Sequence, residues 1–130
     1  MSDEALLAAR LFLGVPFVIW GTMKLRGGEA RLVPVLSAMG LPDASVLAWL
    51  VGVCELVGGV AVCLGYPVRT VGVLLGVWCL MTGYASHKSD LNALLTHVGM
   101  AGGFFLLATV GPGALSLFGG VPTGPFSYVQ

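Results

Sequence analysis

Four long apolar stretches dominate the chain, and short polar segments separate them. They cover about residues 5–23, 45–64, 70–85 and 91–110, of which the third is short. A membrane-spanning helix needs roughly 20 predominantly apolar residues. The runs are continuous rather than alternating in polarity, which disfavours a transmembrane barrel, and lipid offers no hydrogen bonds to a bare backbone. The pattern therefore predicts an all-α, integral membrane four-helix bundle.

The connection between the first two stretches predicts one further, short helix. Leu32, Val35, Leu36 and Met39 recur there at helical spacing, and Gly40-Leu-Pro42 follows them. Apolar residues at this spacing after a charged stretch are typical of an amphipathic helix that lies in the membrane interface. The glycine and the proline are expected to end it.

The chain divides into a four-transmembrane-helix domain at residues 1–110 and a Gly/Pro-rich tail at residues 111–130. The tail carries no charged residue but holds Phe118, Phe126 and Tyr128. A tail that is loose in water would normally be polar. These aromatic residues are therefore candidates for contact with a partner protein, and packing against the chain's own helices is the alternative.

Composition excludes several classes of protein. Hydrophobic residues make up 57% of the chain and charged residues 9%, with six of each sign and a net charge of zero. Soluble domains contain about 25% charged residues, so a soluble enzyme and a disordered chain are excluded. A neutral chain also lacks the basic surface that a nucleic-acid binder needs. The main partner that composition predicts is membrane lipid.

Basic residues at the ends of the stretches predict an orientation. Those on the side of the first and third connections are Lys24, Arg26, Arg31 and Lys88. Arg10 and Arg69 belong to the opposite side. Cytoplasmic loops carry an excess of Lys and Arg, so we expect both termini to lie outside the cytoplasm.

Small residues recur on one face of each of the first three spans, at alternating spacings of four and three residues. Small residues let helices approach closely in lipid, where hydrophobicity gives no drive to associate. The glycines on these faces are Gly14, Gly21, Gly52, Gly59, Gly72 and Gly76. The same faces carry Arg10 and Lys24 on the first span, Glu55 on the second and Arg69 at the start of the third.

Glu55 lies near the centre of the second span and is the strongest candidate for chemistry. A charge at bilayer centre costs about 2.5–3.5 kcal/mol on insertion scales, so we expect Glu55 to be protonated or to meet a cation. Arg10 and Arg69 enter from the side where the second span ends, and a guanidinium can grip a carboxylate with two hydrogen bonds. The sequence leaves open a structural pair that fixes helix register, a ligand, quinone or proton site, and an ion path.

His97 in the fourth span is a further ligand candidate. A neutral imidazole can hydrogen-bond a quinone carbonyl or bind a metal, or simply bond a neighbouring backbone group. The two histidines stand ten residues apart and no CxxC, phosphate loop or nucleotide fingerprint occurs. We therefore expect no metal site and no intrinsic cofactor, although a bound quinone or lipid fits the pattern.

The order and spacing of several motifs resemble the DoxX family of small four-helix membrane proteins. The motifs are Arg10-Leu-x-Leu-Gly14, then Gly21 and Lys24, Gly40-Leu-Pro42, Glu55-Leu-Val-Gly-Gly59, Gly65-x-x-x-Arg69 and Gly111-Pro-Gly-Ala-Leu-Ser-Leu117. The resemblance covers nearly the whole chain. In the family the last motif often continues with Asp, whereas Phe118 follows it here.

The resemblance implies a multi-pass protein of the bacterial inner membrane. Some members are similar to the small subunit of thiosulfate:quinone oxidoreductase, and others are associated with membrane redox and thiol-stress complexes. More distant relatives handle cargo or assembly. From the resemblance and the residues together we expect an accessory subunit of a quinone-linked complex, not catalytic alone, that binds other protein subunits.

Such a subunit would hold quinone or lipid in a pocket formed by Arg10, Glu55, Arg69 and His97. One alternative is a purely structural or assembly subunit without a ligand. The other is a stand-alone carrier of small molecules or protons that uses Glu55.

Overall fold

The computed structural model describes residues 2–87 and 89–119, and the part that it describes is helical with no strand. Its elements are α1 (Asp3–Leu25), the short 3-10 helix η1 (Gly28–Arg31), α2 (Val33–Ala38), α3 (Ala44–Leu64), α4 (Val68–His87) and α5 (Leu91–Val110). Four helices are long and apolar enough to cross a membrane: α1, α3, α5 and residues Val68–Ala85 of α4. The predicted all-α fold with four spans and a short extra helix is confirmed.

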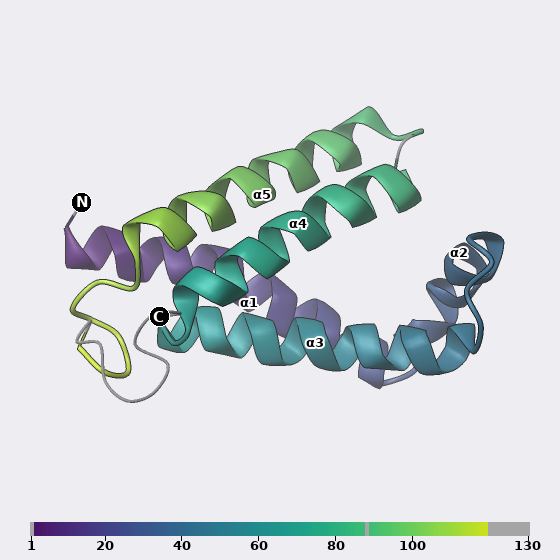
Figure 1. Cartoon of the computed structure of the whole chain (residues 1–130), viewed down its shortest axis with the longest axis horizontal. Helices are drawn as coiled ribbons and strands as arrows, with labels where there is room; N and C mark the ends of the chain where they lie inside the picture. The colour runs from purple at the N-terminus through teal and green to yellow at the C-terminus, as the bar shows by residue number, and fades with distance from the viewer. Residues whose placement is uncertain (1, 88, 120–130) are drawn as a thin grey trace.

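The four spans form two antiparallel pairs, α1 with α3 and α4 with α5 (Figure 1). A short connection ending in Pro67 joins α3 to α4. These two helices touch as far as their middles, where a Cβ on Gly58 would lie 3.2 Å from the side chain of Leu75. Beyond that point they diverge (Figure 1). The bundle is therefore closed at one end and open at the other.

Local sequence signals explain where the helices begin and end. The Ser2 hydroxyl caps α1 by accepting a hydrogen bond from the amide of Ala5, and the Asp90 carboxylate caps α5 by accepting two backbone amides. Side-chain oxygens at these positions satisfy amides that have no partner inside the helix. Gly65 ends α3 in the left-handed region, with φ +81°, a conformation that glycine adopts without steric cost.

Glycine allows the backbones of α1 and α3 to touch. A Cβ on Gly21 would lie 2.5 Å from the amide nitrogen of Leu56, and one on Gly59 would lie 2.7 Å from the amide nitrogen of Val18. Gly14 and Gly52 are also buried in this contact. Van der Waals contact at this range is the main force between helices in lipid, so the two stripes of small residues hold this pair together.

The second pair packs in the same way. A Cβ on Gly72 would lie 2.9 Å from the carbonyl oxygen of Phe104, and one on Gly76 would lie 2.6 Å from the ring of Phe105. Phe104 also packs edge-on against Phe17 of α1, with ring centroids 5.2 Å apart. This aromatic contact connects the two pairs across the core.

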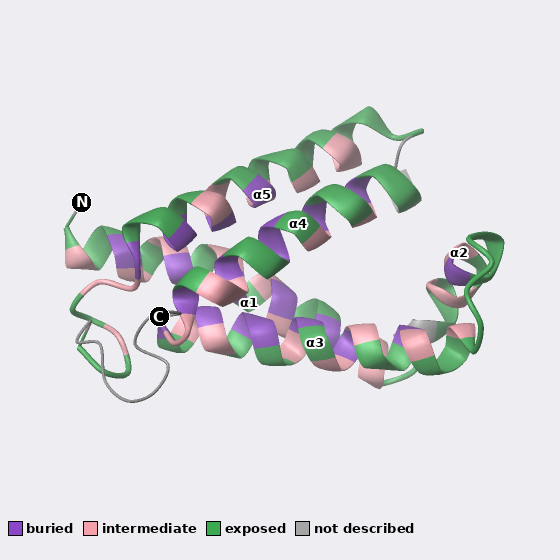
Figure 2. Cartoon of the chain, viewed as in Figure 1, coloured by how far each residue is buried: buried purple, intermediate pink, exposed green. Residues whose placement is uncertain are grey.

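The buried residues form narrow stripes along the inner faces of the helices, and the outer faces are exposed (Figure 2). Large apolar side chains occupy those outer faces, including Phe12, Val57 and Leu74. Such surfaces are the normal lipid-facing surfaces of membrane spans. Membrane lipid is therefore a contact partner, as the composition predicted.

Candidate functional site

Glu55 is held by side chains from two other helices. It lies in the middle of α3 and is 5% exposed. The ammonium of Lys24, at the end of α1, lies 2.5 Å from Oε2 of Glu55. The indole Nε1 of Trp78, in the middle of α4, donates a hydrogen bond to Oε1 over 3.0 Å. Both carboxylate oxygens are thus occupied, and the network joins α1, α3 and α4.

The end of α1 explains how Lys24 reaches a residue at mid-membrane. A Cβ on Gly52 would lie 3.0 Å from Cβ of Lys24, so α1 ends opposite Gly52. That point lies about 12 Å along α3 from its first residue, at 1.5 Å per residue. The chain then turns at Gly27, with φ +103°. Beyond this turn, η1 and α2 contact the N-terminal part of α3, which α1 leaves uncovered. Lys24 therefore stands at the floor of a hollow rather than at the surface.

The predicted pairing of Glu55 with Arg10 or Arg69 is wrong. Arg10 packs against Gly65, about 15 Å along α3 from Glu55, and its Nη2 donates to the carbonyl oxygen of Leu115. Nη1 of Arg69 donates to the carbonyls of Ala108 and Thr109, over 3.1 and 2.9 Å. Unpaired carbonyls and the negative dipole end of a helix attract cations. Both arginines therefore bind backbone carbonyl groups at the closed end of the bundle.

Arg10 is the largest fully buried side chain, and its burial is unusual. Its Nε and Nη1 atoms have no hydrogen-bond partner among the residues that the structure describes. The surroundings are the C-terminal end of α3 and the loop at Leu115. The partial negative charge of that helix end adds to the hydrogen bond with Leu115 in stabilising the buried guanidinium.

His97 lies in a different part of the bundle. Its Nδ1 shares a hydrogen bond with the carbonyl oxygen of Ala93, 2.8 Å away on the same helix, and its Cβ packs against Gly83 of α4. The structure therefore does not bring Arg10, Glu55, Arg69 and His97 into one pocket. A site at Glu55 has to be formed with Lys24 and Trp78 instead.

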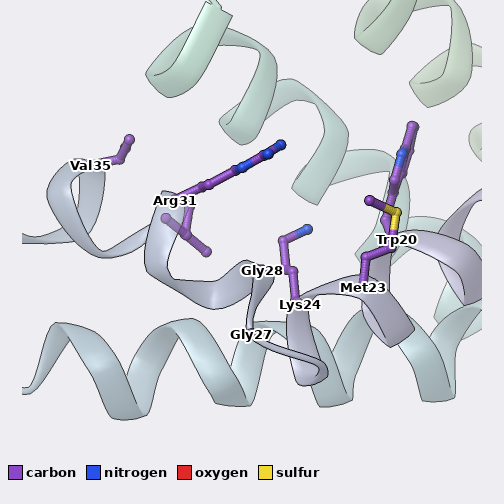
Figure 3. Close-up of a pocket in the computed structure, with 8 residues that line it drawn as sticks. Trp20, Met23, Lys24, Gly27, Gly28, Arg31 and Val35 are labelled. Carbon is purple, nitrogen blue, oxygen red and sulfur yellow. The ribbon is translucent and has the colours of Figure 1, made fainter.

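An open cleft of about 520 Å³ lies beside Lys24, between the end of α1 and the segment formed by η1 and α2. Its lining residues are Trp20, Met23, Lys24, Gly27, Gly28, Arg31, Leu32 and Val35. Figure 3 shows the Arg31 side chain extending over Lys24, with the Trp20 ring at the far side. Most of the wall is apolar, and the two cations supply hydrogen-bond donors. An apolar cleft with a few convergent polar groups is typical of a ligand site.

Two residues of the Glu55 network were not predicted as site residues. The spacing places Lys24 on the packing face of the first span with Gly21, and no motif singles out Trp78. The sequence did contain the signal for Lys24, because Gly21 and Lys24 share a face and Glu55 shares a face with Gly52 and Gly59. The signal for Trp78 depended on where α4 crosses α3, which spacing does not give.

The described part of the tail packs on the chain itself. The amide of Ala114 donates to Oδ1 of Asp3 and the amide of Leu117 donates to the carbonyl of Leu64, both over 2.8 Å. Phe118 packs edge-on against Tyr66, with ring centroids 4.8 Å apart. Phe126 and Tyr128 lie outside the described residues, so partner contact by these two stays a prediction.

No group of three or more His, Cys, Asp or Glu side chains that could hold a metal comes together within residues 2–87 and 89–119. The charged side chains that line the cleft are Lys24 and Arg31, and both are cations. Cations repel a metal ion, so the cleft suits an electron-rich or carbonyl-bearing ligand instead.

Two Escherichia coli (strain K12) proteins resemble this chain over most of their length. Inner membrane protein YqjF is 31% identical over 122 residues, covering 90% of this chain and 92% of YqjF. Inner membrane protein YphA is 32% identical over 123 residues, covering 86% of each. A Bacillus subtilis (strain 168) protein, "Putative oxidoreductase CatD", is 35% identical over 71 residues, covering 55% of this chain and 51% of CatD. No solved structure matches the chain significantly.

The four apolar spans and the inner-membrane relatives together show a multi-pass protein of the inner membrane, which confirms the predicted location. The model of the DoxX family matches residues 5–88. This match covers α1 to α4, and with them all three residues of the Glu55 network. The chain therefore belongs to the DoxX family.

Proposed function

We propose that this chain is a small membrane subunit of a quinone-linked redox complex, and that it binds the quinone ring in the cleft beside Lys24. The observation that carries the proposal is the buried Lys24–Glu55–Trp78 network, which opens through Lys24 onto an apolar cleft. An ionisable residue inside a membrane span points to function by default, with its partner named.

The chemistry of the cleft fits a quinone ring. An ammonium has three N–H donors, and Glu55 takes one of those on Lys24. The other two, with the guanidinium of Arg31, can donate to quinone carbonyl oxygens. The indole of Trp20 and the side chains of Met23, Leu32 and Val35 provide apolar surface for the ring. Glu55 fixes the position of the ammonium from behind.

The redox part of the proposal rests on two supports outside the cleft. The relative that matches 55% of this chain carries the name "Putative oxidoreductase CatD". The sequence has no nucleotide fingerprint, and its described residues form no metal-ligand cluster. We therefore propose that the electron-transfer centre belongs to a partner subunit and that this chain anchors it.

Ring binding can be tested with the purified chain in nanodiscs. Duroquinone, a tetramethyl ring without a long chain, is titrated while tryptophan fluorescence is followed, since Trp20 lines the cleft. We expect saturable quenching that weakens about tenfold in Arg31→Met, because a hydrogen bond from a charged group contributes about 1.5–3 kcal/mol. Arg26→Met, which removes an exposed cation outside the cleft, is the matched control. Equal quenching in all three proteins would exclude a quinone site here.

The partner is tested by gentle purification from the native membrane followed by native mass spectrometry. A cofactor-bearing subunit that remains bound supports the redox complex, and a quinone-mass adduct supports the pocket. A partner without any quinone in either experiment would favour a structural or assembly subunit. Recovery of this chain with phospholipid alone, and with no partner subunit, would favour a stand-alone carrier that uses Glu55.

A further inference from the structure

A second cavity lies on the other side of α2. It also measures about 520 Å³, and its lining residues are Pro34, Val35, Ala38, Met39, Tyr84 and Ala85. Five of these six residues are apolar, and they come from α2, the residue after it and the end of α4. Val35 lines both cavities. The short helix α2 thus separates the cleft beside Lys24 from a groove that faces α4.

The groove lies nearer to the membrane surface than the cleft does. Trp78, which bonds Glu55 at mid-membrane, is about 10 Å along α4 from Ala85. Lys24, at the floor of the cleft, stands opposite Gly52, about 12 Å along α3 from its first residue. A molecule that moves from this surface along α4 toward Lys24 therefore passes α2.

A glycine in the left-handed region stands at each end of the segment that contains α2. Gly27 has φ +103° and Gly40 has φ +72°, and a Cβ on either glycine would meet nothing within 4 Å. Between them, α2 buries one side chain, that of Leu36. A six-residue helix with a single buried anchor and glycines in open space at both ends can swing with little loss of packing.

We propose that α2 is a lid that closes onto the end of α4, and that the groove between them is the entrance to the cleft beside Lys24. Closure brings Ala38 and Met39 against Tyr84 and Ala85 and fills the groove. Opening leaves the groove joined to the cleft past Val35. The apolar lining favours passage of an apolar or amphipathic molecule over passage of an ion. This proposal concerns access to the cleft and holds whichever molecule binds there.

Closure is tested with a cysteine pair across the groove, Ala38→Cys with Ala85→Cys, in nanodiscs. The background carries Cys54→Ala, Cys63→Ala and Cys79→Ala, because those three cysteines are free thiols. A disulfide needs Cα atoms about 4.4–6.8 Å apart, so it forms only when the lid reaches α4. We expect efficient disulfide formation in this pair and none in Ala38→Cys with Leu80→Cys, since Leu80 does not line the groove.

Access is tested in the same protein with Leu32→Cys added, because Leu32 lines the cleft and is half-buried. We expect the locked lid to slow labelling of this thiol by N-ethylmaleimide, a small uncharged reagent, at least tenfold, and reduction of the disulfide to restore it. The locked pair is identified by mass spectrometry of its linked peptide. If Ala38→Cys with Ala85→Cys perturbs folding, Met39→Cys with Tyr84→Cys replaces it. If no disulfide forms across the groove, α2 does not close onto α4. If labelling is unchanged in the locked protein, the groove is not the entrance to the cleft.

Discussion

The ammonium of Lys24 lies 2.5 Å from the Glu55 carboxylate, although the two residues are 31 positions apart and one of them ends its helix. The contact exists because α1 is displaced along α3 toward the closed end of the bundle. Arg10 packs against Gly65, where α3 ends, whereas Lys24 stands opposite Gly52, well inside α3. The last turn of α1 therefore lies within the span of α3, and this offset creates both the buried ion pair and the cleft beside it.

Removing one member of the pair should destabilise the protein. In Lys24→Met the Glu55 carboxylate loses its counter-charge, and breaking a buried pair costs about 3–5 kcal/mol. We expect the lower end of that range, because the Lys24 side chain is 23% exposed. Thermal unfolding in nanodiscs measures the loss. The double variant Lys24→Met/Glu55→Gln should recover most of it, and Arg26→Met should stay within about 0.5 kcal/mol of the unmodified protein. A stable Lys24→Met would show that the pair does not hold the fold.

Packing of α1 against α3 should be sensitive to a single methyl group. Gly21→Ala places a Cβ 2.5 Å from the Leu56 amide nitrogen, where the backbone has to move. Overpacking of this kind costs about 1–3 kcal/mol, whereas alanine alone would favour the helix. Gly99→Ala and Gly102→Ala are the matched controls, because a Cβ there meets nothing within 4 Å. We expect thermal unfolding to separate Gly21→Ala from both controls, and equal stabilities would contradict the close contact.

Arg10 should hold the loop at residues 111–119 against the helices. Arg10→Met removes the hydrogen bond to the Leu115 carbonyl, and a bond from a charged group contributes about 1.5–3 kcal/mol. Loop opening should therefore rise about tenfold or more. Hydrogen–deuterium exchange of the Leu117 amide, which donates to the Leu64 carbonyl, measures the opening. Arg69→Met, which acts at the end of α5, is the comparison. Unchanged exchange would show that the Asp3 and Leu64 contacts hold the loop unaided.

The turn at Gly65 should tolerate substitution less well than the turn at Gly40. Both glycines have positive φ, so an alanine at either position pays about 1–2 kcal/mol of backbone strain. Only at Gly65 does a Cβ also meet neighbours, the guanidinium of Arg10 and, at 2.6 Å, Cβ of Ser116. We expect Gly65→Ala to unfold at the lower temperature, and the difference from Gly40→Ala isolates the crowding around Arg10. No difference between the two variants would show that Arg10 simply moves aside.

Much of the helix pairing could be read from glycine spacing. The stripes through Gly14 and Gly21 and through Gly52 and Gly59 predicted faces of close approach, and the structure places all four glycines in the contact between α1 and α3. The partners of Glu55 could not be read in this way. Choosing between Arg10 and Lys24 required the relative heights of two helices, and a stripe of small residues permits several registers.

The sequence by itself determined the membrane location, the four spans, the short extra helix and the packing faces, because hydropathy and periodicity are local properties of the chain. The tertiary structure alone decided which cation meets Glu55, how Trp78 joins them and where the cleft opens. Those features depend on where α1 ends relative to α3 and on how α4 leaves the turn at Gly65. Differences of a few ångströms in register separate an ion pair from two distant charges, since Coulomb energy and hydrogen bonds fall off steeply over that range.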